Sequence, residues 1–201
     1  MAMSIAHSNP LRAAASSAKE ATEKWCIVVA TASDGDRLPT ARWMRTVRLQ
    51  LHVPHTSASD VYAALANFER YPILCAAVQH VAVTEVSERV TVSQWEVTFR
   101  AGLLRWTEED TFDPAALTIT FRQLDGDIAI FDGSWQCTDA AQGSEVLFDA
   151  RLDMGIPSLA DALEPIAART LIDNIVSIVH GLVGEAELVE SGMTVPAGSV
   201  S

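Results

Sequence analysis

The stretch HVAVTEVSERVTVSQWEVTFRAGLLRWTEEDTFD, residues 80–113, contains three runs in which apolar and polar residues alternate. The runs cover residues 80–86, 89–99 and 103–113. Alternation with a period of two predicts strands with one buried face, because successive side chains of a strand point to opposite sides of a sheet. Only a few residues separate the runs, and such short links join antiparallel neighbours. The stretch therefore predicts three consecutive strands of an antiparallel sheet.

Similar runs flank this stretch on both sides. They predict further strands over residues 44–53, 117–124, 128–137 and 145–154. The predicted sheet therefore has seven strands, one before residues 80–113 and three after them.

Helices are predicted at two places in this order. Between the first two strands, residues 57–68 show helical spacing, and Ser57 with an acid three residues later fits an N-terminal cap. A second short helix is expected near Pro72. Residues 158–183 predict one long helix, with Ser158 as its N-cap and two glycines near its end.

This order predicts an α+β domain over residues 44–184. The apolar face of a curved antiparallel sheet needs a cover, and the C-terminal helix is the one long candidate. A sheet that grips a helix leaves a cavity between them, which is a typical ligand site. Residues 1–43 are a poorly determined N-terminal extension, and residues 185–201 are expected to form a flexible tail.

Composition and charge exclude several classes of function. The chain has 201 residues, of which 49% are apolar, and a net charge of −12. Such an acidic surface repels nucleic acids and does not dock on anionic membranes through a basic patch. No signal peptide or membrane-inserted segment is evident, and the three widely spaced cysteines contain no metal-binding pair, so we expect a cytoplasmic protein without a metal. No phosphate-binding loop or nucleophile motif is present, so we expect no cofactor.

Several phrases carry a resemblance to a known superfamily. SASDVYAALANFERYP (57–72), WTEEDTFD (106–113), ALTITFRQLDGD (116–127) and FDGSWQC (131–137) resemble the polyketide cyclase/dehydrase and coenzyme-Q-binding branch of the START and Bet v 1-like (SRPBCC) proteins. The resemblance covers residues 44–184 and implies a helix-grip fold. Members include aromatase/cyclases, which act on poly-β-ketone chains held by an acyl carrier protein, and lipid or quinone carriers without chemistry. The implied ligand is therefore a polyketide or a lipid-like small molecule, with an acyl carrier protein as partner if the substrate is tethered. The oligomeric state is left open.

Two acids share the apolar face of the strand over residues 103–113. Glu108 and Asp110 stand two residues apart and therefore project to the same side as Trp106. Burial and mutual repulsion would keep one of them protonated and leave the other basic, which suits a catalytic acid/base pair. The alternative is a β-bulge that leaves one acid in solvent or paired with a nearby arginine.

The resemblance also identifies a departure at this strand. The aromatase/cyclases carry Trp-x-Ser-x-Arg here, and this chain reads Trp106-x-Glu108-x-Asp110. An ionised Asp110 would repel the oxyanion that the arginine is credited with holding. The aromatase mechanism therefore does not carry over to this position.

Other candidates are expected to bind the substrate. Trp95 and Trp106 lie on adjacent strands with the same inward parity, where they would stack on a planar ligand or simply pack in the core. The remaining candidates, each with a structural role as its alternative, are Tyr71 at the cavity mouth, Asn174 on the long helix, Asp132 as a third inward acid, and Phe112.

We interpret the sequence as a cyclase-type enzyme, a lyase or an isomerase. It would fold a reactive chain and promote ring closure or dehydration by positioning and proton transfer. The main alternative is a non-catalytic carrier of a lipid, quinone or metabolite. A further alternative is a module that binds another protein through an exposed apolar patch.

Overall fold

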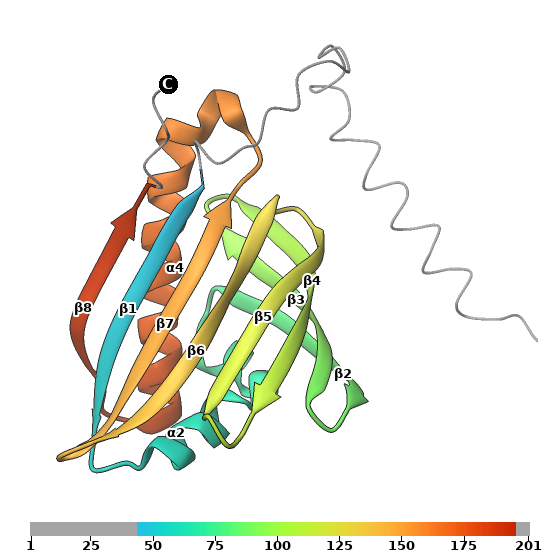
Figure 1. Cartoon of the computed structure of the whole chain (residues 1–201). Coiled ribbons are helices and arrows are strands. Elements are labelled where there is room, and N and C mark those ends of the chain that lie inside the picture. The colour runs from blue at the N-terminus through green and yellow to red at the C-terminus, as the bar shows by residue number, and fades with distance from the viewer. Residues whose placement is uncertain (1–43, 196–201) are drawn as a thin grey trace, which may run out of the picture. The chain divides into compact units, whose positions relative to one another are not determined.

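The computed structural model describes residues 44–195, so the predicted extension 1–43 lies outside the described residues. One antiparallel sheet holds eight strands in the order β2-β3-β4-β5-β6-β7-β1-β8. The strands are β1 Arg45–Pro54, β2 Val78–Ser87, β3 Val90–Phe99, β4 Gly102–Asp113, β5 Thr118–Gly126, β6 Ile130–Ala140, β7 Gly143–Asp153 and β8 Glu187–Thr194. Figure 1 shows the sheet bending around the long helix α4, Ala160–Val183. The predicted helix-grip arrangement of an α+β domain is confirmed.

The short helices also lie where the sequence predicts them. Helix α2 spans Ala58–Leu65, and the side chain of Ser57 caps it by accepting a hydrogen bond from the backbone N–H of Asp60. A 3-10 turn, η2, Phe68–Arg70, leads directly into helix α3, Tyr71–Leu74. These elements cover the lower end of the sheet in Figure 1.

Helix α4 begins slightly later than predicted. A 3-10 turn, η3, spans Pro157–Leu159, so Ser158 lies inside that turn and Leu159 takes the N-cap position. The prediction that Ser158 is the N-cap of this helix is therefore wrong. By length and composition alone this helix could cross a membrane, but its inner face packs on the sheet with Ala167, Ile175 and Ile178 buried.

The core forms between α4 and the alternate residues of the strands. Val47, Leu49, Leu51 and Val53 of β1 are fully buried, as their period of two predicts. Burying each side chain of this size stabilises the fold by about 1.5–3 kcal/mol. The polar face of α4 is exposed, as its helical spacing predicts.

The eighth strand corrects the prediction of seven strands followed by a loose tail. Strand β8 pairs antiparallel with β1, after Gly184 turns the chain with a φ of 87°. All eight residues of β8 are exposed. With neither face buried, the strand needs no alternation of apolar and polar residues, and the sequence therefore carries no strand signal there.

Strands β5 and β6 pair over a short distance. Their register runs from Thr118 opposite Gln136 to Arg122 opposite Asp132 and ends there. The rest of β5 pairs with β4, and the first residues of β6 pair with β7. The two strands therefore separate at the end that leads into the turn between them.

Candidate functional site

A cavity of about 90 Å³ lies between the sheet and α4. Aromatic side chains dominate its wall, and three polar residues join them. The aromatic lining residues are Phe68, Tyr71, Trp95, Trp106, Phe121, Phe131, Trp135 and Phe148. The polar lining residues are Glu108, Asp110 and Asn174.

Both carboxylates of β4 point into this cavity. Glu108 is 4% exposed and Asp110 is 1% exposed. The β4–β5 pairing does contain an irregularity between Thr107 and Glu108, but the β3–β4 register runs through without a break, so the predicted common face is kept. The nearby arginines form ion pairs with other acids and not with Glu108 or Asp110. Arg105 pairs with Glu96, and Arg122 pairs with Glu109.

A chain of hydrogen bonds holds the two acids. Trp106 Nε1 donates to Glu108 Oε2 at 2.7 Å. Ser93 Oγ donates to Asp110 Oδ2 at 2.6 Å, and Trp95 Nε1 donates to Ser93 Oγ at 2.8 Å. Asp110 Oδ1 is buried and has no hydrogen-bond partner within residues 44–195. One oxygen of Asp110 is therefore left without a partner in the described part of the chain.

Burial raises the pKa of both acids. Desolvation, followed by the charge of Asp110, raises the pKa of Glu108 to about 8. Desolvation also raises the pKa of Asp110 to about 6, against the opposing effect of the hydrogen bonds from Ser93 and Thr91. Asp110 therefore ionises first, and its charge then holds the remaining proton on Glu108. Near neutral pH the pair carries one proton.

The two tryptophans stack on each other. The rings of Trp95 and Trp106 are nearly parallel, at 5° with centroids 5.8 Å apart, and Phe131 meets Trp106 edge-on at 5.6 Å. Both rings line the cavity as their parity predicts, and each indole N–H is already engaged. They form a rigid wall that orients the acids.

Tyr71 and Asn174 also line the cavity. The Tyr71 hydroxyl donates to the carbonyl of Leu65 at 2.7 Å, so the phenol ties the two helical segments together. Burial raises the pKa of Tyr71, which stays neutral. Asn174 Oδ1 accepts from Cys75 Sγ at 3.7 Å.

Two predicted site residues lie elsewhere. Asp132 points to the outer face and forms an ion pair with Arg151, so the prediction of a third inward acid is wrong. Ile128 is buried and has the same parity as Asp132, but it precedes β6 and belongs to the turn. Phe131 and Trp135 are the inward residues of the strand. Phe112 packs on Phe68, at 5.9 Å between centroids, and is not part of the cavity lining.

Ser93 is the residue that the sequence argument missed. It is fully buried and links Trp95 to Asp110. It stands two residues before Trp95, on the same face of β3, and lies opposite Glu108 in the register. Extending the parity argument from Trp95 to Ser93 would have found it.

Metal ligation is not suggested by the described part of the chain. Within residues 44–195 no three His, Cys, Asp or Glu side chains gather as a ligand set.

Comparisons with known proteins agree with this architecture. The family model described as polyketide cyclase / dehydrase and lipid transport matches residues 54–177. The actinorhodin polyketide synthase bifunctional cyclase/dehydratase of Streptomyces coelicolor is 29% identical over 168 residues, which are 78% of this chain and 51% of that protein. The chain thus spans about half the length of this curated relative.

Solved structures share the fold. An aromatase/cyclase from a Streptomyces species superposes with a TM-score of 0.58 at 22% identity, covering 70% of this chain and 92% of the other. A START superfamily protein from Mycobacterium smegmatis superposes with a TM-score of 0.60 at 14% identity, covering 70% and 97%. These likenesses establish the helix-grip fold.

Proposed function

The chain belongs to the polyketide cyclase / dehydrase and lipid transport family, and we propose that it is a cyclase that closes a ring in a poly-ketone chain. The observation that carries this proposal is the pair of buried carboxyl groups in the cavity. Asp110 offers a free oxygen as base, and Glu108 keeps a proton as acid. The aromatic wall excludes water and holds an apolar, oxygenated chain in a folded conformation.

The proposed first step is enolisation. Asp110 Oδ1 removes a proton from a carbon beside a ketone, which in a short triketone is the terminal methyl carbon, and becomes neutral. Glu108, whose Oε2 is occupied by Trp106, presents its proton on Oε1 to the developing enolate oxygen. This hydrogen bond takes the place of the arginine that related enzymes carry at the position of Asp110.

Ring closure and dehydration would follow with the same two groups. The enolate carbon forms a bond to a second ketone carbon, and Glu108 transfers its proton to that ketone oxygen. The Glu108 carboxylate then removes a proton beside the new alcohol, and neutral Asp110 protonates the departing hydroxyl as water. Both acids return to their starting states, and loss of water would make the enzyme a lyase.

The test uses heptane-2,4,6-trione, a linear triketone that closes to orcinol with loss of one water. The wild-type protein should accelerate orcinol formation. Asp110→Asn and Glu108→Gln should each reduce the rate by about 100-fold or more, because each removes a proton-transfer group. Glu109→Gln is the matched control, since Glu109 lies on the outer face of the same strand in an exposed ion pair with Arg122.

Calorimetric titration with orcinol shows whether the variants still bind the product. A rate loss with retained binding supports acid/base catalysis. Full turnover in both the Asp110→Asn and Glu108→Gln variants would refute it.

A carrier function is the second candidate. Three hydrogen bonds to the acids come from within the protein, one from Trp106 to Glu108 and two from Ser93 and Thr91 to Asp110. Such a wall also suits storage of an apolar ligand. A carrier would bind orcinol without accelerating its formation. If the natural substrate is tethered, the partner would be an acyl carrier protein.

A further inference from the structure

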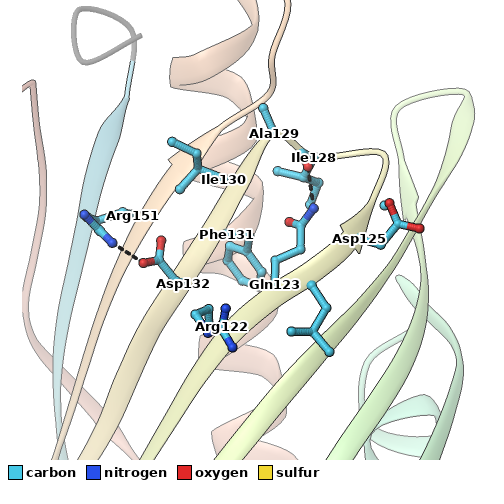
Figure 2. Close-up of a pocket in the computed structure, with 11 residues that line it drawn as sticks. Arg122, Gln123, Asp125, Ile128, Ala129, Ile130, Phe131, Asp132 and Arg151 are labelled. Atoms are coloured by element: carbon cyan, nitrogen blue, oxygen red, sulfur yellow. Dashed lines mark hydrogen bonds and ion pairs between the residues drawn. The ribbon is translucent and has the colours of Figure 1, made fainter. Parts of the chain in front are cut away.

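A second, larger hollow of about 510 Å³ opens on the outer side of the sheet between β5 and β6 (Figure 2). It lies where the two strands stop pairing after Arg122 and Asp132. The side-chain amide of Gln123 donates to the carbonyl of Ile128 across this opening. A side-chain contact thus stands where backbone hydrogen bonds would otherwise close the sheet.

The lining of the hollow comes from both faces of the sheet. It combines outward residues, such as Arg122 and Asp132, with inward residues, such as Gln123 and Phe131. Successive side chains of a strand point to opposite faces, so residues of both faces border the hollow where the two strands stop pairing. Phe131 also lines the inner cavity, where its ring meets Trp106. The linings of the two spaces therefore share the Phe131 side chain.

The polar groups of the hollow favour an uncharged, oxygenated ligand. Gln123 Oε1 and Asp132 Oδ1 are buried and have no hydrogen-bond partner among residues 44–195. Leaving such acceptors unpaired is unfavourable, and a hydroxyl or enol of a ligand would satisfy them once the side chains that cover them move aside. The two arginines at the rim already pair with Glu109 and Asp132, so the hollow presents no free cationic group to an anion.

The inner cavity alone is too small for a poly-ketone chain. Ligand sites for molecules of that size usually measure about 300–1,000 Å³, and the inner cavity measures about 90 Å³. Adding the outer hollow brings the available space into that range.

We propose that the cavity and the hollow form one continuous ligand site for an elongated, oxygenated chain. The reacting end lies at Asp110 and Glu108, and the remainder passes between β5 and β6, beside a displaced Phe131 ring, into the hollow. The assignment of the reacting end rests on the proposed function. The passage through the sheet rests on the strand separation and on the shared residue Phe131.

The test compares two resorcinols by calorimetric titration: orcinol, which carries a methyl group, and its homologue 5-heptylresorcinol. The measured quantity is the ratio of their dissociation constants in the same variant. In the wild type the heptyl homologue should bind at least about tenfold more tightly, because its tail leaves water for the hollow. Leu124→Trp and Gln123→Trp, which fill the hollow, should reduce this ratio to below about threefold.

Thr120→Trp is the matched control, because Thr120 lies exposed on β5 outside the hollow and should leave the ratio as in the wild type. Phe131→Ala should increase the ratio by removing the ring between the two spaces. An unchanged ratio in both filled variants would overturn the proposal.

The outcome is separable from that of the proposed function. The filled variants could lose the binding ratio while the Asp110→Asn and Glu108→Gln variants keep full turnover. That result would support the proposed ligand site in the hollow and refute acid/base catalysis. An unchanged binding ratio in the filled variants, with turnover lost in the Asp110→Asn and Glu108→Gln variants, would support acid/base catalysis. It would refute the proposed passage of the ligand between β5 and β6.

Discussion

At the scale of the residue, the hydrogen bond from Ser93 to Asp110 supports the proposed role of Asp110 as the base. Asp110 Oδ2 receives hydrogen bonds from Ser93 and Thr91, which lower its pKa against the effect of burial. Glu108 is more strongly affected by burial and also by the charge of Asp110. Two carboxyl groups on one strand thereby acquire different protonation states near neutral pH.

Ser93→Ala should shift the pH dependence of orcinol formation. Removing the hydroxyl takes away a donor that favours the ionised form, so the pKa of Asp110 should rise and the acidic limb of the profile should move to higher pH. We expect the rate near neutral pH to fall several-fold, about 3- to 30-fold, with less effect at alkaline pH. Gln94→Ala, on the exposed face of the same strand, should leave the profile unchanged. An unshifted acidic limb in the Ser93→Ala protein would contradict this role.

The unfolding free energy of the Glu108→Gln variant, relative to that of the wild type at the same pH, should increase as pH rises. The pKa of Glu108 in the folded state lies above its ordinary value, so folding favours the protonated form, and this contribution is lost as pH rises through the folded pKa. Glutamine carries no such dependence. The difference in unfolding free energy between variant and wild type should therefore grow from about pH 5 to pH 9, by roughly 1 kcal/mol or more. Urea denaturation across this range measures it, and Glu109→Gln should show no comparable trend.

At the scale of the element, strand β6 depends on a close approach of backbones at Gly133. A Cβ built there would lie 2.2 Å from the carbonyl oxygen of Asp149 and 2.8 Å from Cα of Ala150 on β7. Both obstacles are backbone atoms that cannot rotate away. Gly133 therefore marks a place where β6 packs tightly against β7.

Gly133→Ala should lower the stability of the sheet. We expect a loss of about 1–3 kcal/mol, since the extra methyl group forces a shift of paired strands. Gly102→Ala is the matched control, because its Cβ would meet nothing closer than 3.7 Å. Thermal denaturation of both variants separates the two cases. Equal melting temperatures would show that β6 and β7 can move apart without cost.

At the scale of the whole molecule, the sheet and helix α4 enclose a cavity with few polar groups, and hydrogen bonds within the protein hold these groups in place. Only the packing of β4, β3 and α4 brings Asp110, Ser93 and Asn174 to the same space. The strand separation between β5 and β6 then offers a route from this space to the outer face. Reaction chemistry and ligand access therefore depend on different parts of one sheet.

The resemblance of the sequence to a known superfamily implied the helix-grip fold. The sequence by itself determined the order of the elements from β1 to α4 and the inward face of Glu108 and Asp110. These features follow from periodicity, because the burial of alternate residues leaves a local pattern in the chain. Trp95 and Trp106 were predictable for the same reason.

Only the tertiary structure decided the eighth strand, the outward face of Asp132 and the role of Ser93. Strand β8 is held by backbone hydrogen bonds to β1, which leave no pattern in its side chains. The direction of Asp132 depends on where β6 begins to pair, and the protonation of Asp110 depends on a donor from another strand. Such features are set by contacts between distant segments, and local periodicity does not encode them.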